Sequence, residues 1–292
     1  MKAMEVQHVS VDFKKEKALN DITITLNGPG VYGMLGRNGA GKTTLLSVMA
    51  NYLFPTDGAV YIDGEPLFEQ KKQTSQVYFC YPKDISAETE KASKLLKRMD
   101  RMIPSFDMEV AKKLAKRFNL NLNKRASSYS TGMASMFQVV KGIATRAPIT
   151  IFDEAYAGMD APAREIFYEA IQEEQEHHPR LFIISTHYIS EVEYLFDHAI
   201  ILHNGSVLKE GSYEELLSSG FSVTGEASQV DAFTKGLEVL KEKTLGGTKQ
   251  VVIFKEDADG LKQEAEELGF EIGSLTLQDL FTSLTKEEQQ DD

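Results

Sequence analysis

The order of apolar and polar residues near the start of the chain predicts strands that lead into a helix. Residues 6–13 and 22–26 alternate apolar and polar side chains, as strands with one buried face do. Residues 31–35 are apolar without interruption, which is typical of a strand buried on both faces. A glycine-rich loop follows, and we expect a helix over about 42–53. Asp-Gly pairs on both sides predict a hairpin around residues 60–62.

A second region of apolar runs predicts a parallel sheet. Residues 149–152 and 181–184 are further buried-strand candidates, and a helix is expected between them over about 161–176. The order strand, helix, strand requires a crossover connection, so the fold class is α/β with a parallel core sheet. Residues 199–208 predict a hairpin that turns at Asn204-Gly205.

The middle of the chain is helical in pattern and rich in lysine. We expect a helical subdomain over about 84–142. Within it, residues 84–125 carry eleven bases and six acids, a local balance of +5. This segment therefore differs in charge from the rest of the chain.

The last part of the chain is acidic and changes character after about Gly220. Helices are expected at about 226–241 and 258–268, alternating with short strands, and a last helix begins near Leu277. We predict a large domain over 1–215 and a small accessory α/β domain with an acidic tail over 221–292. Residues 256–292 hold a balance of −10, so most of the net charge of the chain lies here.

Composition excludes several classes of protein. The 292 residues carry a net charge of −12, which argues against a nucleic-acid partner bound by general phosphate neutralisation. The single cysteine, Cys80, permits no internal disulfide and fits a reducing compartment. No secretory leader is expected from the first residues. No apolar run reaches about 18 residues, so we do not expect the chain to span a membrane by itself.

A phosphate-binding loop is the clearest chemical motif. Residues 36–44 fit G-x-x-x-x-G-K-[ST] between a predicted buried strand and a helix. Glycines let backbone N–H groups converge on phosphates, and the helix N-terminus adds partial positive charge. Lys42 is expected to reach the β- and γ-phosphates, and the Thr43 hydroxyl to bind Mg²⁺. The expected binding residues are Gly36, Arg37, Asn38, Gly39, Ala40, Gly41, Lys42, Thr43 and Thr44.

Acids and a histidine follow the two later buried strands. Asp153 and Glu154 end the first, at the sheet edge where α/β folds bind ligands. Asp153 is expected to hold Mg²⁺ through water, and Glu154 to polarise an attacking water as general base. His187 ends the second strand, where an imidazole could contact the γ-phosphate or serve only a structural role.

The combined motifs resemble the nucleotide-binding subunits of ATP-binding cassette (ABC) transporters. Residues 129–133 are similar to the L-S-G-G-Q signature of that family, and they stand 23 residues before Asp153. Asp153 in turn stands 34 residues before His187. Residues 157–160 resemble the D-loop, and Phe13 occupies the place of the aromatic residue that stacks on adenine. The resemblance extends over residues 1 to about 215.

This resemblance implies an architecture and a mode of action. It implies a P-loop NTPase cassette with a parallel core sheet, an antiparallel β subdomain and a helical subdomain, binding ATP and Mg²⁺. Two cassettes would close head to tail over two ATP molecules, with Ser130 and Gly132 contacting the γ-phosphate across the interface. Closure and hydrolysis would drive transmembrane permease subunits. The basic segment is either a solvated face or a surface that docks such subunits near anionic lipid.

The sequence departs from the family pattern at several positions. Lys83 replaces the usual glutamine, and a lysine cannot ligate Mg²⁺; it either contacts a phosphate or acidic partner or is simply solvated. Thr131 and Met133 replace a glycine and a glutamine of the signature. These changes suggest a weaker ATP site, in a homodimer or in a heterodimer with a second cassette.

We therefore predict an ATPase subunit, cytoplasmic and peripheral on the inner face of the cell membrane. Residues 274–281 resemble the end of exporter cassettes of the drug- and bacitracin-resistance branch, which favours export. Two alternatives remain: an ATP-gated regulatory cassette with weak hydrolysis, and a soluble ABC ATPase without a transport role. The single set of motifs disfavours the soluble class, and Glu154 and His187 disfavour the regulatory class.

Overall fold

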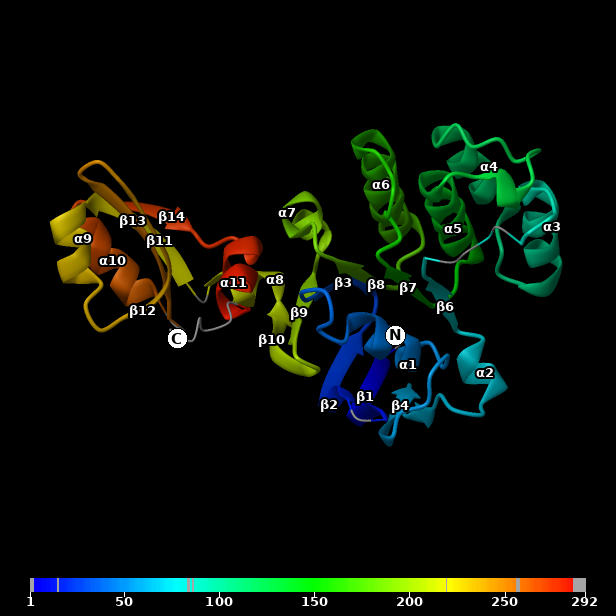
Figure 1. Ribbon diagram of the computed structural model, residues 1–292, viewed down its shortest axis with the longest axis horizontal. Helices are drawn as coiled ribbons and strands as arrows, with labels where there is room; N and C mark the ends of the chain where they lie inside the picture. The colour runs from blue at the N-terminus through cyan, green and yellow to red at the C-terminus, as the bar shows by residue number, and fades with distance from the viewer. Residues whose placement is uncertain are drawn as a thin grey trace.

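The fold is taken from a computed structural model, which describes residues 3–14, 16–82, 85, 87–218, 220–255 and 258–285. A central sheet separates an antiparallel sheet on one side from helices on the other, and a smaller sheet domain extends to one side (Figure 1). No helix in these described ranges has the length and apolarity needed to cross a membrane.

The central sheet carries the motifs. Its strands run in the order β10-β9-β3-β8-β7-β6, with β10 antiparallel to β9 and the others parallel, which confirms the predicted parallel core. Its inner strands are apolar throughout because helices or the second sheet cover both faces. The strands are β3 (Gly30–Leu35), β6 (Val77–Cys80), β7 (Ile149–Asp153), β8 (Leu181–Thr186), β9 (His198–His203) and β10 (Ser206–Ser212).

An antiparallel sheet packs beneath the central one. Its order is β2-β1-β4-β5, formed by β1 (Ala3–Phe13), β2 (Glu16–Asn27), β4 (Asp57–Ile62) and β5 (Glu65–Pro66). Helix α1 (Lys42–Met49) is enclosed between the two sheets, and its Leu45 and Leu46 are fully buried. The helix expected over 42–53 thus ends earlier, at Met49, and Asn51 just beyond it has a positive φ of 59°.

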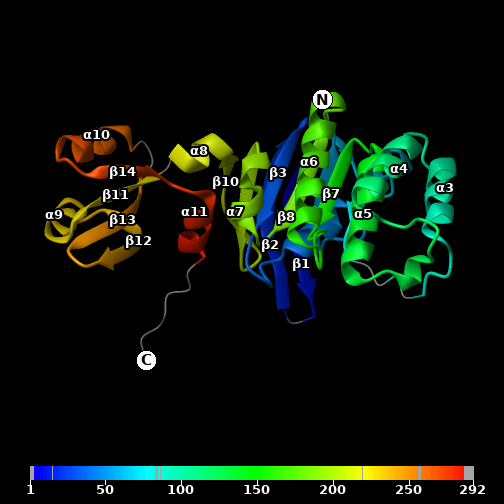
Figure 2. The ribbon, with the colours of Figure 1, turned by 90° about the horizontal axis from the view of Figure 1, so that it is seen from above.

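Helices cover the opposite face of the central sheet (Figure 2). Over the sheet lie α5 (Thr131–Thr145), α6 (Ala161–His177) and α7 (Ile189–Val192), whereas α3 (Ala92–Met102) and α4 (Met108–Arg117) pack on α5 beyond the edge strand β6. The range 84–142, where a helical subdomain is expected, holds α3, α4, the short turn η1 (Ala126–Ser128) and most of α5. Asp107 caps α4 by accepting hydrogen bonds from the N–H groups of Glu109 and Val110. The remaining short segments are α2 (Lys71–Thr74) and η2 (Glu193–Leu195).

The C-terminal part holds a separate antiparallel sheet in the order β12-β13-β11-β14. The chain order is strand, helix, strand, strand, helix, strand, which is the ferredoxin-like arrangement. Its core forms between the sheet and its two helices. The elements are β11 (Gly220–Glu226), α9 (Ala227–Phe233), β12 (Glu238–Leu245), β13 (Thr248–Phe254), α10 (Asp259–Glu267) and β14 (Glu271–Ser274).

The prediction of one helix over 226–241 was wrong. Helix α9 ends at Phe233, and residues 238–241 belong to strand β12. Gly236 has a φ of 84°, a left-handed conformation that interrupts a helix at this point. The pattern of the segment suited a helix, but pairing with β13 determines its structure.

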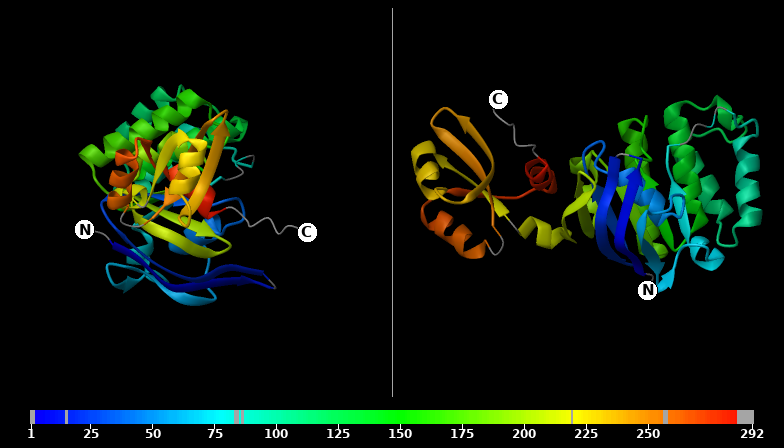
Figure 3. Two further views of the ribbon diagram at one scale, coloured as in Figure 1. Left: turned by 90° about the vertical axis from the view of Figure 1, so that its left-hand side faces the viewer. Right: turned by 60° about the horizontal axis from the view of Figure 1, so that its bottom comes forward.

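The last described helix returns to the first domain. Helix α8 (Tyr213–Ser218) precedes the ferredoxin-like unit, and α11 (Leu277–Leu284) follows it; both lie between that unit and the central sheet (Figure 3). Leu277, Leu280 and Phe281 of α11 are buried in the same apolar core as the helices above the central sheet. The backbone N–H of Leu277 donates to the Glu193 carboxylate at 3.1 Å. The chain therefore leaves the first domain and comes back to it.

Candidate functional site

The glycine-rich loop connects the end of β3 to the start of α1. Gly41 is the N-cap of α1 and has a φ of 103°, and a Cβ there would lie 2.9 Å from the carbonyl oxygen of Ala18. Only glycine fits this conformation and this close approach. The Lys42 Nζ donates to the carbonyl oxygens of Gly36 at 2.7 Å and Arg37 at 3.2 Å. Lys42 is the first residue of α1, and its side chain folds back so that the loop surrounds its ammonium group.

Opposing effects act on the pKa of Lys42, and burial is the larger. Burial lowers the pKa of the Lys42 ammonium, while the nearby Glu154 and Asp153 carboxylates raise it in opposition. A cation that is only 6% exposed interacts strongly with any anion beside it, because little water screens the charge. The loop therefore offers both backbone N–H groups and a desolvated positive charge to a phosphate.

Asp153 lies at the end of β7 against the phosphate loop. It is 2% exposed, and its carboxylate accepts hydrogen bonds from the Thr43 hydroxyl at 2.7 Å and the Ser185 hydroxyl at 2.6 Å. A hydroxyl oxygen and a carboxylate oxygen at this separation are the hard oxygen donors that Mg²⁺ prefers. Thr43 and Asp153, both predicted from the sequence as metal residues, thus fit such an ion.

Glu154 follows Asp153 and turns toward the loop. Its φ of 44° lies in the left-handed region, which a glutamate rarely adopts. Ser185 stabilises this turn, since its hydroxyl oxygen accepts the Glu154 N–H at 2.9 Å while donating to Asp153. One buried serine thereby fixes both acids relative to the phosphate loop.

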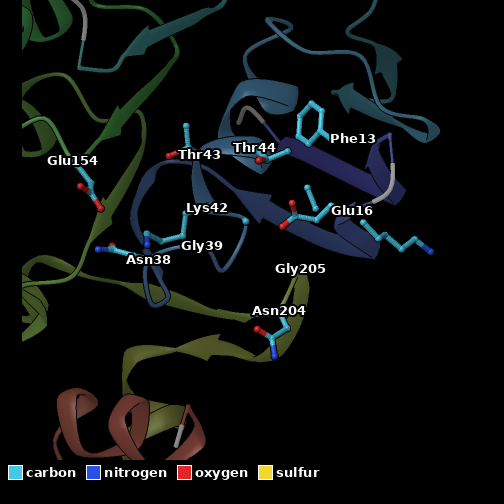
Figure 4. Close-up of a pocket in the computed structure, with 13 residues that line it drawn as sticks. Phe13, Glu16, Asn38, Gly39, Lys42, Thr43, Thr44, Glu154, Asn204 and Gly205 are labelled. Atoms are coloured by element: carbon cyan, nitrogen blue, oxygen red, sulfur yellow. The ribbon is translucent and has the colours of Figure 1, made fainter. Parts of the chain in front are cut away.

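A cavity of about 700 Å³ joins most of the predicted nucleotide residues (Figure 4). Glu154 and Lys42 border it from one side, and Phe13 of β1 stands at the other with 48% of its surface exposed. An exposed aromatic ring beside a phosphate loop can stack on a nucleobase. The lining residues are Phe13, Glu16, Lys17, Ala18, Asn38, Gly39, Gly41, Lys42, Thr43, Thr44, Glu154, Asn204 and Gly205.

A second cavity of about 420 Å³ shares Asn38 and Asn204 with the first. His187 lines it, and the His187 Nδ1 lies 3.4 Å from the Glu154 Oε1. The other lining residues are Gly36, Arg37, Ala40, His203 and Phe281. The structure thus brings the loop, Glu154 and His187 together, as the sequence predicts, and adds α11 to their surroundings.

The signature residues begin helix α5, away from both cavities. Ser130 is the N-cap of α5, and its hydroxyl oxygen accepts the Met133 N–H at 3.3 Å. Gly132 packs directly on the D-loop, because a Cβ at Gly132 would lie 2.2 Å from the carbonyl oxygen of Gly158. Neither Ser130 nor Gly132 borders the nucleotide cavity of its own chain. Their predicted contact with a γ-phosphate requires a second cassette.

Several residues of the site were not predicted. A serine inside an apolar strand gives no signal of its contacts, so the sequence does not indicate that Ser185 binds Asp153. The sequence predicts Asn204 and Gly205 only as a hairpin turn, yet they border the cavity. Phe281 lines the second cavity because α11 packs back on the first domain. Lys83, which departs from the family pattern, lies outside the described residues.

The sequence matches a model of a known protein family and several known proteins. A family model described as "ABC transporter" matches residues 19–157. The chain is 31% identical over 216 residues to the ABC transporter ATP-binding protein NatA of Bacillus subtilis, covering 70% of this chain and 86% of NatA. It is 27% identical to the bacitracin transport ATP-binding protein BcrA of Bacillus licheniformis, with 70% and 68% covered.

Solved structures share the fold. An ATP-binding subunit of an ABC transporter matches with a TM-score of 0.65 at 24% identity, over 73% of this chain and 91% of that chain. A dimeric ATP-binding cassette in a post-hydrolysis state with ADP and Pi matches with a TM-score of 0.62 at 18% identity, over 72% and 98%. These likenesses confirm the predicted cassette architecture.

Proposed function

The chain belongs to the ABC transporter family of ATP-binding cassettes, and from this membership we propose that it hydrolyses ATP to power separate transmembrane subunits. The observation that carries the proposal is the convergence of Lys42, Thr43 and Glu154 on one cavity, with the buried Asp153 hydrogen-bonded to Thr43 at its edge. Phosphoryl transfer depends mainly on positioning and charge stabilisation, and this cavity supplies both.

Each residue has a proposed role. The loop amides and Lys42 bind the β- and γ-phosphates, and Phe13 stacks on adenine. Thr43 and Asp153 hold Mg²⁺, which when bound supplies neutralisation of phosphate charge. Glu154 orients a water and accepts its proton as general base. His187 donates a hydrogen bond toward the γ-phosphate.

The working assembly is a head-to-tail pair of cassettes. In this pair Ser130 and Gly132 of one subunit contact the γ-phosphate held by the phosphate loop of the other. Their position outside the cavities of their own chain supports this arrangement. Thr131 places a side chain where the family has glycine, which supports an alternative pairing with a second, different cassette and two unequal sites.

The membrane partners dock on the side of the antiparallel sheet and the helical part. Tyr52, Phe54 and Phe68 are 63%, 56% and 46% exposed, and the two phenylalanines border a cavity of about 340 Å³ with a mostly apolar lining. Exposed aromatic groups of this kind mark protein–protein contacts. The basic segment 84–125 would face anionic headgroups at the cytoplasmic membrane surface. We propose export, on the resemblance of residues 274–281 to the end of exporter cassettes.

The test is phosphate release by the purified chain with Mg-ATP, compared with Glu154→Gln. We expect turnover by the wild type and a loss of about 100-fold or more in the variant, with binding of a fluorescent ATP analogue retained. Turnover by the chain alone would remove the need for a second cassette. Turnover that Glu154→Gln leaves unchanged would contradict the role of Glu154. Wild-type inactivity, both alone and with a co-purified membrane protein, would refute the ATPase.

A further inference from the structure

A buried tyrosine contacts the histidine of the candidate site. Tyr156 is 3% exposed, and its hydroxyl oxygen lies 3.2 Å from the His187 Nδ1 and 3.2 Å from the His187 backbone nitrogen. The two rings meet edge to face with centroids 5.8 Å apart. Tyr156 therefore touches His187 through both its backbone and its imidazole.

The hydrogen bonds of this hydroxyl can be counted. A tyrosine oxygen has one proton to donate and two lone pairs to accept with. The His187 N–H donates to one lone pair. The nearby Thr186 hydroxyl opposes the rise in the Tyr156 pKa, and its own oxygen already accepts the Tyr188 N–H at 2.9 Å. Among the described residues, the His187 Nδ1, at 3.2 Å, is then the acceptor to which the Tyr156 proton is directed.

From this count we propose that Tyr156 is a positioning residue that fixes His187 as the Nε2–H tautomer. Nδ1 accepts the Tyr156 proton, so the imidazole carries its own proton on Nε2. Nε2–H is then the donor that His187 offers in the cavity it shares with the phosphate loop. This inference rests on the proposed ATPase function, since the donor is useful only toward a phosphate oxygen.

Two further observations support this assignment. Burial raises the pKa of Tyr156 to about 12, so the hydroxyl retains its proton and can donate it. The Glu154 Oε1 also faces Nδ1, at 3.4 Å, and alone it would favour the opposite tautomer with the proton on Nδ1. The Tyr156 oxygen lies closer to Nδ1, at 3.2 Å, and it carries a proton to donate there, which the Glu154 carboxylate does not.

The chain offers a matched control. The Tyr188 ring also packs on the His187 imidazole, with centroids 4.3 Å apart, and on the Tyr156 ring at 5.4 Å. Tyr188 is 41% exposed, and the contact is made through the rings. Tyr156→Phe and Tyr188→Phe each remove one hydroxyl and preserve the ring. The pair therefore separates the hydrogen bond from ring packing.

The first measurement is the tautomer itself. Proton–nitrogen correlation spectra of protein labelled with ¹⁵N-histidine would be recorded near pH 8.5, well above the ordinary histidine pKa of about 6.5, and His187 assigned with His187→Gln. We expect Nε2–H in the wild type and in Tyr188→Phe, and a mixture or Nδ1–H in Tyr156→Phe. A wild-type His187 protonated on Nδ1, or an unchanged tautomer in Tyr156→Phe, would overturn the proposal.

The second measurement is steady-state ATP hydrolysis. We expect Tyr156→Phe to lower kcat by about 10- to 100-fold with KM for ATP within about threefold, and Tyr188→Phe to stay within about twofold of the wild type. A loss confined to KM would contradict the positioning role. A wild type with the Nε2–H tautomer but no hydrolysis would refute the proposed function and leave the tautomer assignment intact.

Discussion

The backbone of Gly132 passes so close to Gly158 that a methyl group on Gly132 would lie 2.2 Å from the Gly158 carbonyl oxygen. This contact joins the start of the signature helix to the D-loop that follows Glu154. The two segments that a partner cassette would meet therefore pack directly on each other as one unit.

Gly132→Ala should disrupt this unit. The added methyl cannot fit, so we expect a loss of about 1–3 kcal/mol in the free energy of unfolding from the forced backbone shift, together with reduced ATPase activity. Gly260→Ala is the control, because nothing lies within 4 Å of a Cβ there and its helical position favours alanine. Chemical unfolding of both variants measures the difference. Equal stability of the two would contradict the close contact.

Ser185→Ala should weaken the metal end of the site. The change removes a hydrogen bond to Asp153 and leaves the Glu154 N–H without its acceptor, at a cost of about 1–3 kcal/mol in stability. We also expect ATP hydrolysis to require a higher Mg²⁺ concentration, because Asp153 is less firmly held. Ser75→Ala, which removes only a local contact with the Lys72 carbonyl, serves as control. The measurement is the ATPase rate as a function of Mg²⁺ concentration. An unchanged Mg²⁺ requirement in Ser185→Ala would contradict the role of Ser185.

Phe13→Ala should weaken nucleotide binding. Loss of aromatic stacking on a base costs about 1–3 kcal/mol, equivalent to a roughly 5- to 150-fold rise in Kd. Phe13→Tyr should restore affinity, since it keeps the ring. Phe54→Ala provides a control, because Phe54 is also exposed but packs on Phe68, outside the nucleotide cavity. Titration with a fluorescent ATP analogue measures all three, and equal affinity of Phe13→Ala and the wild type would exclude stacking.

Glu193 should make the docking of α11 sensitive to pH. Burial raises the pKa of Glu193 above its ordinary value of 4.5, and the N–H groups of Leu277 and Gln278 oppose this only in part. A carboxyl with a raised pKa in the folded state contributes stability that is full below 4.5 and lost as pH rises through the raised value. Wild type should therefore lose stability relative to Glu193→Gln as pH increases.

Urea unfolding of both proteins at several values from pH 4.5 to 7.5 measures this difference. Glutamine preserves an oxygen that can accept the Leu277 N–H without carrying a charge. Since other titrating groups are shared by the two proteins, their contributions cancel in the comparison. A wild type that gains stability over Glu193→Gln with rising pH would reverse the sign and contradict the assignment.

The local sequence was sufficient to predict the buried strands and the phosphate loop, because their residue patterns are distinctive. The short apolar runs at 31–35, 149–152 and 181–184 favoured buried strands, and the phosphate loop has a spacing that few other structures share. Segment 226–241 failed because its pattern allowed a helix or a strand, and pairing with β13 decided between them.

The sequence predicted only those residues of the site that belong to recognisable motifs. Lys42, Thr43, Asp153, Glu154 and His187 stand in recognisable positions, and the structure brings them together. Ser185 contacts Asp153, and Tyr156 contacts His187, across about 30 positions of sequence. No local pattern indicates contacts between residues so far apart. Polar side chains that act by holding a neighbour are visible only once the chain is folded.

The return of α11 determines how the ferredoxin-like unit can be removed experimentally. A truncation after Ser218 would also strip Leu277, Leu280 and Phe281 from the core of the cassette and bare the apolar surface they cover. The resulting loss of activity would be attributed wrongly to the missing sheet. An internal excision of residues 220–274 that leaves α11 on the chain is the deletion that separates the role of the ferredoxin-like unit from that of the helix.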